Sequence, residues 1–125
     1  MLLDTHTLLW FLEDDSRLPP SLRSLIEDGD SVFASIISLW EIAIKLSINK
    51  LVLQVEFQDL PSVLDNLEIG VLPLTFADAA QYLSLPLHHR DPFDRMLIAQ
   101  AMTNSLAIAS ADTAFDAYPI QRMWA

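Results

Sequence analysis

Short apolar segments alternate along the chain with segments of helical periodicity, and this alternation limits the possible folds more than any other feature. The strand-like segments are rich in Leu, Ile, Val and Ala and lack the polar alternation of a strand with one face in water. Strands buried on both faces and separated by helices are typical of a parallel sheet covered by helices. The sequence therefore predicts an α/β fold.

Apolar spacing and helix caps divide the chain into the expected elements. Strands are expected at Met1–Leu3, Ser31–Ile37, Ile69–Leu72 and Leu106–Ala109. Helices are expected at Thr7–Glu13, Pro19–Asp28, Leu39–Ile48, Glu56–Asn66, Phe76–Ser84 and Pro92–Asn104. Because Gly29 and Gly70 are the only glycines, a glycine-rich phosphate loop is excluded.

Composition narrows the class of protein. A length of 125 residues without repeats or linkers fits one domain over residues 1–125. The net charge of −10 argues against a protein that coats nucleic acid and suits a basic protein partner. The absence of cysteine excludes disulfides and thiolate metal sites. Since no apolar run is long enough to cross a bilayer and the start lacks a secretory signal, we expect a cytoplasmic protein with no membrane contact.

Acidic side chains stand at several corners where a strand passes into a helix. Asp4 follows the first strand, Ser38 follows the second with Glu41 one turn later, Asp94 lies in the first turn of the last helix, and Asp112 follows the last strand. Ligands of open parallel sheets bind at the carboxyl ends of the strands. Converging carboxylates repel one another, and a divalent cation resolves this repulsion. Mg²⁺ and Mn²⁺ prefer such oxygen ligands and can activate water against a phosphodiester.

These acids also have simple structural explanations. Asp94 stands at the third position of a helix that Asp91 would cap, where the helix dipole favours an acid. Glu41 follows Ser38 at the spacing of a capping box, or pairs with the lysine one turn on. Asp112 would cap a short helix after the last strand. Taken without further information, the residues indicate an acidic site at a sheet edge or a set of helix caps.

Four strings of the sequence together resemble the PIN-domain family, and more narrowly its VapC-type toxins. They are Met1–His6, Ala34–Ile42, Arg90–Ala101 and Ile108–Asp112, in the family's order and over nearly the whole chain. The string Asp-Pro-Phe-Asp-Arg within the third is the most specific.

The resemblance implies a three-layer α/β/α fold around a short, mostly parallel sheet. It also implies a divalent-metal endoribonuclease that uses Mg²⁺ or Mn²⁺, forms a homodimer and is inhibited by a cognate antitoxin. When the family's site is carried over position by position, the resemblance implies that Asp4 and Asp94 are the principal metal ligands. Glu41 and Asp112 are then expected to hold a second metal or to orient the attacking water. The hydroxyls expected to support these ligands belong to Thr5, Ser38 and Ser110.

Two further groups of residues are ambiguous. The run His88-His89-Arg90 and Arg95 could contact RNA phosphate, but a solvated polar loop is the favoured reading of the run. The aromatic residues Trp10, Phe11 and Trp40 belong either to the core or to a groove for the antitoxin.

Three functions stay open from the sequence. The leading one is an endoribonuclease toxin that cleaves RNA. The second is a catalytically silent PIN-like module that acts through protein contacts. The third is a phosphoryl-transfer protein of another α/β type, although Asp4-Thr5-His6 lacks the second aspartate that many aspartyl phosphatases use.

Overall fold

In the computed structural model, which describes residues 1–124, five parallel strands form one sheet in the order β3-β2-β1-β4-β5. The strands are β1 (Leu2–Leu3), β2 (Val32–Ser35), β3 (Ile69–Leu72), β4 (Ile108–Ala109) and β5 (Arg122–Met123). The helices are α1 (Thr5–Leu12), α2 (Pro20–Asp28), α3 (Ile36–Ser47), α4 (Leu60–Asn66), α5 (Phe76–Ser84) and α6 (Pro92–Asn104). Two short 3₁₀ helices are η1 (Phe57–Asp59) and η2 (Thr113–Ala117).

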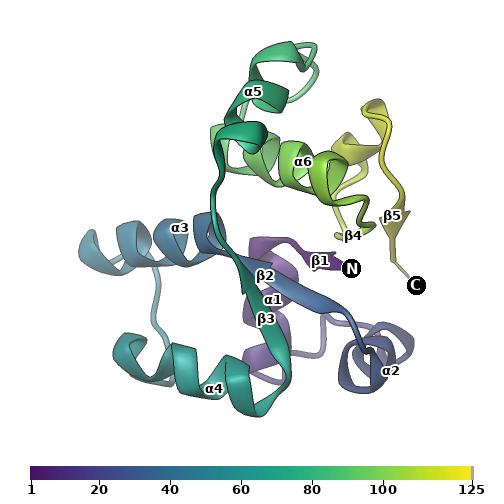
Figure 1. Cartoon of the computed structure of the whole chain (residues 1–125). Coiled ribbons are helices and arrows are strands. Elements are labelled where there is room, and N and C mark those ends of the chain that lie inside the picture. The colour runs from purple at the N-terminus through teal and green to yellow at the C-terminus, as the bar shows by residue number, and fades with distance from the viewer. Residues whose placement is uncertain (125) are drawn as a thin grey trace.

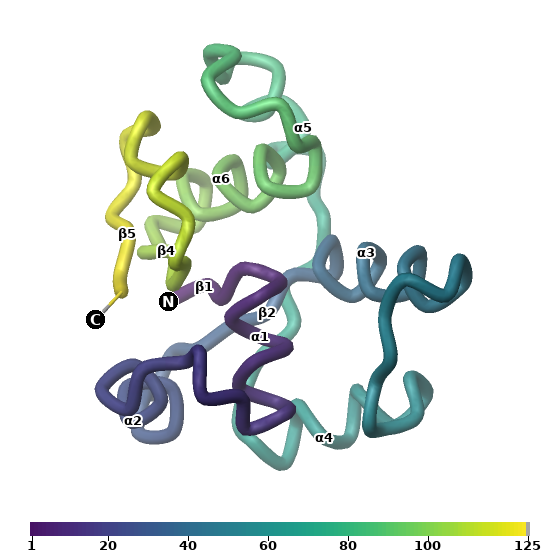
Figure 2. The backbone as a smooth tube through the Cα atoms, turned by 180° about the vertical axis from the view of Figure 1, so that it is seen from behind, coloured from purple at the N-terminus to yellow at the C-terminus, as the bar shows by residue number. Residues whose placement is uncertain are grey.

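Alternate residues of the strands point into two separate cores, one on each face of the sheet. Leu3 packs in a cluster with residues of α1, α2 and α4, whereas Leu2 packs with residues of α6. The neighbouring strand β4 divides in the same way, with Ala109 in the first cluster and Ile108 in the second. Figures 1 and 2 show α5 and α6 on one side of the sheet and α1, α2 and α4 on the other. This arrangement confirms the predicted α/β fold with its parallel sheet between helical layers.

The order in which successive strands are added to the sheet reverses at β1. The two strands that follow β1 in sequence extend the sheet on one side, and the last two extend it on the other. At such a reversal the connections leave in opposite directions, so that the carboxyl ends of β1, β2 and β4 border an open crevice. Helices α1 and α3 begin directly at this edge, as Figure 1 shows.

The start of α3 differs from the prediction. The strand β2 ends at Ser35 and the helix begins at Ile36, because the Ser35 hydroxyl accepts a hydrogen bond from Ile37 N and caps the helix. Ser38 therefore lies inside the helix, and its predicted role as the cap was wrong. The helix predicted for Glu56–Asn66 is divided into η1 and α4.

The tail after the last predicted strand adds an edge strand. Residues Arg122–Met123 pair with β4 in parallel, with Ile108 opposite Arg122. The sequence offered no apolar run there. Within residues 1–124, no helix has the length and apolar character needed to cross a membrane.

Candidate active site

The predicted carboxylates meet around one small cavity at the carboxyl edge of the sheet. The cavity has a volume of about 110 Å³. Its lining residues are Asp4, Thr5, His6, Glu41, Lys45, Asp91, Asp94 and Asp112. The structure thus brings together all four acids that the sequence placed at strand-to-helix corners.

Asp4 is held between the central strands and the first helix. Its Oδ1 accepts a 2.9 Å hydrogen bond from Thr7 N, so it caps α1, and its own N donates to Ala109 O at 3.1 Å. The Thr7 hydroxyl donates to the same carbonyl at 3.0 Å. Asp4 is 5% exposed. Because cap and strand pairing both fix its backbone, the carboxylate has a defined place at the edge.

Glu41 projects from the second turn of α3. Its Oε1 accepts a hydrogen bond from Thr5 Oγ1 at 2.8 Å, and its Oε2 lies 3.0 Å from Lys45 Nζ. The Thr5 hydroxyl is also 2.9 Å from Ser38 Oγ. Both Thr5 and Ser38 are buried, and Thr5 contacts the carboxylate directly while Ser38 contacts only Thr5.

Asp94 lies in the first turn of α6, beyond the cap Asp91. Asp91 Oδ1 accepts hydrogen bonds from Phe93 N at 2.8 Å and Asp94 N at 3.3 Å, which confirms its predicted capping role. Burial raises the pKa of Asp94 to about 7, and the nearby charge of Asp91 is the next largest cause. The charges of Asp4 and Glu41 raise the pKa further, while His89 opposes the shift.

Asp112 completes the cluster from the loop after β4. Its Oδ1 accepts from Ala114 N at 2.9 Å, so it caps η2 as the sequence also suggested. Its N donates to Ser110 Oγ at 3.0 Å, and Arg122 Nη1 donates to the Ser110 carbonyl at 3.1 Å. The predicted support from Ser110 is therefore given to the backbone of Asp112.

His89 is a site residue that sequence reasoning missed. Its Nε2 lies 3.1 Å from Asp94 Oδ2 and 3.4 Å from Asp112 Oδ2. One ligand atom from each of the three side chains lies within 4.8 Å of the others. A solvated loop was the favoured reading for residues 88–90, and for His89 it was wrong.

Arg95 does not face the cavity, so its predicted contact with RNA phosphate was wrong. It is 7% exposed, and its Nη1 donates to the carbonyls of Pro86 at 3.1 Å and His89 at 3.4 Å. Its guanidinium lies 4.8 Å from the centre of the Tyr82 ring. Arg90, in contrast, is exposed.

The donor set fits a hard divalent cation. Carboxylates dominate the cavity, and the pKa of Asp94 is raised first by burial and then by the charges of neighbouring acids. Oxygen ligands of this kind are those that Mg²⁺ and Mn²⁺ prefer. Asp4, Glu41, Asp94 and Asp112 all line the cavity and offer such oxygens. Among the described residues, the ligand atoms that lie within 4.8 Å of one another belong to Asp94, Asp112 and His89.

Several solved structures share this architecture. A comparison with curated proteins finds no match to the chain. The structure of the VapBC2 complex from Rickettsia felis, which is bound to a DNA fragment from its promoter, matches with a TM-score of 0.73 at 13% identity. The match covers 99% of this chain and 98% of that chain. FitAcB from Neisseria gonorrhoeae matches with a TM-score of 0.66 at 24% identity, over 98% of this chain and 95% of that one. A toxin–antitoxin complex from Klebsiella pneumoniae matches with a TM-score of 0.64 at 15% identity, over 98% of this chain and 94% of that chain.

At these low identities, the TM-scores show a shared fold and no more. The family follows from the sequence itself, since residues 1–121 match the family model of the PIN domain. The chain therefore belongs to the PIN domain family.

Proposed function

We propose that this chain is a divalent-metal-dependent endoribonuclease and the toxin component of a toxin–antitoxin pair. The observation that carries the proposal is the convergence of Asp4, Glu41, Asp94 and Asp112 on one cavity from four separate parts of the chain. Membership of the PIN domain family supports nuclease chemistry, and the solved structures with this fold include toxin–antitoxin complexes.

The chain supplies ligands and positioning groups. Asp4 and Asp94 are the proposed principal metal ligands, because Asp4 is buried and caps α1 and Asp94 lies in the first turn of α6 with its side chain 20% exposed. A divalent cation supplies the positive field that neutralises the phosphodiester and lowers the pKa of water. Glu41 and Asp112 hold a second ion or orient the attacking water. Thr5 fixes the orientation of Glu41 through its 2.8 Å hydrogen bond.

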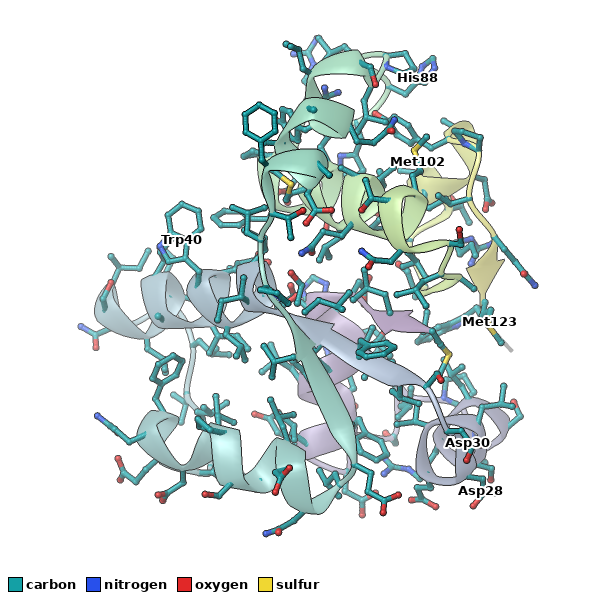
Figure 3. The ribbon with its side chains drawn as sticks, in the orientation of Figure 1. Asp28, Asp30, Trp40, His88, Met102 and Met123 are labelled. Carbon is teal, nitrogen blue, oxygen red and sulfur yellow. The ribbon has the colours of Figure 1, made fainter. Side chains whose placement is uncertain are left out.

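The proposed partners bind apolar surface beside this cavity. Trp40 projects outward from α3, with 58% of its surface exposed (Figure 3). It borders a groove of about 520 Å³ that Leu39, Phe57 and Leu60 also line. A second groove of about 260 Å³ is lined by Trp40, Phe93 and Met96, among others. Apolar surface of this extent suits a homodimer contact or an antitoxin segment.

The charge of the chain suits the same partners. At a net charge of −10, the protein attracts a basic antitoxin. RNA is held by the cation, by the exposed Arg90 and by the second subunit. Replacing Arg90 by Glu is therefore expected to weaken RNA binding.

The deciding experiment is cleavage of a labelled mixed RNA by the purified, antitoxin-free protein, in Mg²⁺ or Mn²⁺ and in EDTA. Wild type is compared with Asp94→Asn and with the control Asp30→Asn. Asp30 is an exposed acid just before β2, near α2 and away from the acidic cavity (Figure 3). Both substitutions remove one carboxylate charge, so only the position differs.

Cleavage that requires metal, persists in Asp30→Asn and is lost in Asp94→Asn supports the proposal. If the folded wild type cleaves no RNA in either metal, the silent interaction module becomes the better account. Turnover of small phosphate esters in place of RNA would identify a phosphatase.

A further inference from the structure

The loop between α5 and α6 brings His89 to the acidic cavity. The side chain of His89 is 16% exposed, and its Nε2 is buried within 3.4 Å of one oxygen from each of two carboxylates. Within residues 1–124, this nitrogen has no hydrogen bond of good geometry. A buried polar atom beside two acids needs a function.

The loop is fixed from two sides. The Tyr118 hydroxyl accepts hydrogen bonds from His88 N at 3.1 Å and His89 N at 2.8 Å, and it donates to Pro86 O at 3.0 Å. Arg95 donates to the carbonyls of Pro86 and His89. The N–H and the C=O of His89 are therefore both held by buried side chains.

The bracing by Arg95 carries an energetic cost. No acidic side chain in the described part of the chain forms an ion pair with this buried guanidinium. Burying a cation without a counter-ion is unfavourable, and its carbonyl contacts only partly offset this. This unfavourable burial coincides with the contacts by which Arg95 fixes the position of His89.

A hydrogen bond within the loop assigns the tautomer of the ring. His89 Nδ1 accepts from Asp91 N at 3.2 Å, so its lone pair is engaged there. The neutral ring then carries its proton on Nε2, which lies near Asp94 and Asp112 without the geometry of a hydrogen bond to either. Binding of a cation by Nε2 would require the opposite tautomer and the loss of the Asp91 hydrogen bond.

We propose that His89 is a positioning residue: a small rotation of its ring turns the Nε2–H onto the carboxylates of Asp94 and Asp112, 3.1 and 3.4 Å away, and so holds them at the spacing that binds one cation. The two acids come from different elements, α6 and the loop after β4, and His89 joins them. The inference rests on the proposed metal site, and its distinct content is that His89 acts as a donor and not as a metal ligand.

Two measurements on the full chain test this role. The first is the ¹⁵N NMR signature of the His89 ring in EDTA and with Mg²⁺, which reports the position of the ring proton. We expect the proton on Nε2 in both states. A proton on Nδ1, or loss of the Nε2 proton when Mg²⁺ binds, would make His89 a ligand and overturn the proposal.

The second measurement is calorimetric titration with Mn²⁺. His89→Leu removes the donor and is expected to weaken Mn²⁺ binding by about 10-fold or more, as is typical when a group that orients metal ligands is lost. His89→Gln keeps an N–H near the position of Nε2 and is expected to restore most of the affinity. His88→Leu is the matched control, since His88 is an exposed residue at the outer end of the same loop (Figure 3).

The outcomes separate this inference from the proposed function. Mn²⁺ affinity that is unchanged in His89→Leu, or equally weak in His89→Gln and His89→Leu, overturns the inference even if wild type cleaves RNA. Wild type that cleaves no RNA but shows the expected tautomer and affinities overturns the ribonuclease alone.

Discussion

Thr5 Oγ1 donates a 2.8 Å hydrogen bond to Glu41 Oε1 and so joins the first residue of α1 to the second turn of α3. Both residues are buried, with exposed fractions of 5% for Thr5 and 9% for Glu41. The bond joins two helices that begin at neighbouring strands. The other oxygen of the carboxylate, Glu41 Oε2, forms an ion pair with Lys45. One acid of the cluster is thus held by one hydroxyl and one lysine.

Replacing that hydroxyl tests its importance. Thr5→Val keeps the shape of the side chain but removes the donor to a buried carboxylate, so we expect RNA cleavage to fall about 10-fold and stability to fall by about 1–3 kcal/mol. Thr5→Ser retains the hydroxyl and serves as the control. The measurements are the cleavage rate and urea unfolding. Equal cleavage by all three proteins would show that Glu41 does not need this orientation.

The raised pKa of Asp94 predicts how stability depends on pH in the absence of metal. Since its pKa of about 7 in the folded state lies above the unfolded value of 3.8, the folded protein binds more protons between these limits. The free energy of unfolding in EDTA therefore falls as pH rises from about 4 to 7. Asp94→Asn removes this loss and is expected to stabilise the protein at pH 8 by on the order of 1 kcal/mol, after allowance for solvent screening.

Thermal unfolding at pH 4 and pH 8 checks this prediction. The gain from Asp94→Asn should appear at pH 8 and largely disappear near pH 4, because the folded carboxyl group is protonated there and the unfolded one is close to its pKa of 3.8. A substitution that destabilises equally at both pH values would mean that the charge of Asp94 is already compensated in the metal-free protein.

Metal binding should reverse this loss of stability. A cation that binds only the folded protein stabilises it by about 2.7 kcal/mol at 100 times its dissociation constant. We therefore expect Mn²⁺ to raise the unfolding temperature of wild type and of Asp30→Asn at pH 8. Asp4→Asn should show little or no rise. Melting curves with Mn²⁺ and with EDTA provide the test, and an equal rise in Asp4→Asn would exclude Asp4 as a ligand.

Much of the architecture followed from the sequence because local signals agreed with it. Asp4 follows β1 directly and Asp112 lies in the loop just after β4, and the open parallel sheet then brings the strand ends to one edge. The role of the four acids as metal ligands stays a prediction, since the structure describes their positions and not a bound ion.

The position of His89 could not be read from the sequence. Its backbone is held by Tyr118, which lies 29 residues away in the chain, and by Arg95 from inside α6. Neither contact leaves a periodic or motif-like trace near residue 89. Arg95 was misassigned for the same reason, because a polar residue near a helix start gives no sign that it turns inward to loop carbonyls.

Local competition also moved the start of α3. Both Ser35 and Ser38 have side chains suited to a helix cap, and the sequence favoured Ser38 because Glu41 follows at capping-box spacing. In the structure, Ser35 caps the helix and is hydrogen-bonded to the buried side chain of Gln100. A contact 65 residues away in the chain therefore decided between two equally suitable caps.

The exposed ring of Trp40 leads to the last prediction. It lies between two apolar grooves and packs against Phe93 with a distance of 5.5 Å between ring centres. If this surface forms the proposed homodimer contact, Trp40→Glu places a charge in it and should convert dimer to monomer. Leu25→Glu is the matched control, because Leu25 is 49% exposed on α2. Light scattering after gel filtration measures the mass of each variant. A dimer that persists in Trp40→Glu would assign this surface to the antitoxin, and binding of the antitoxin should then be lost in the same variant.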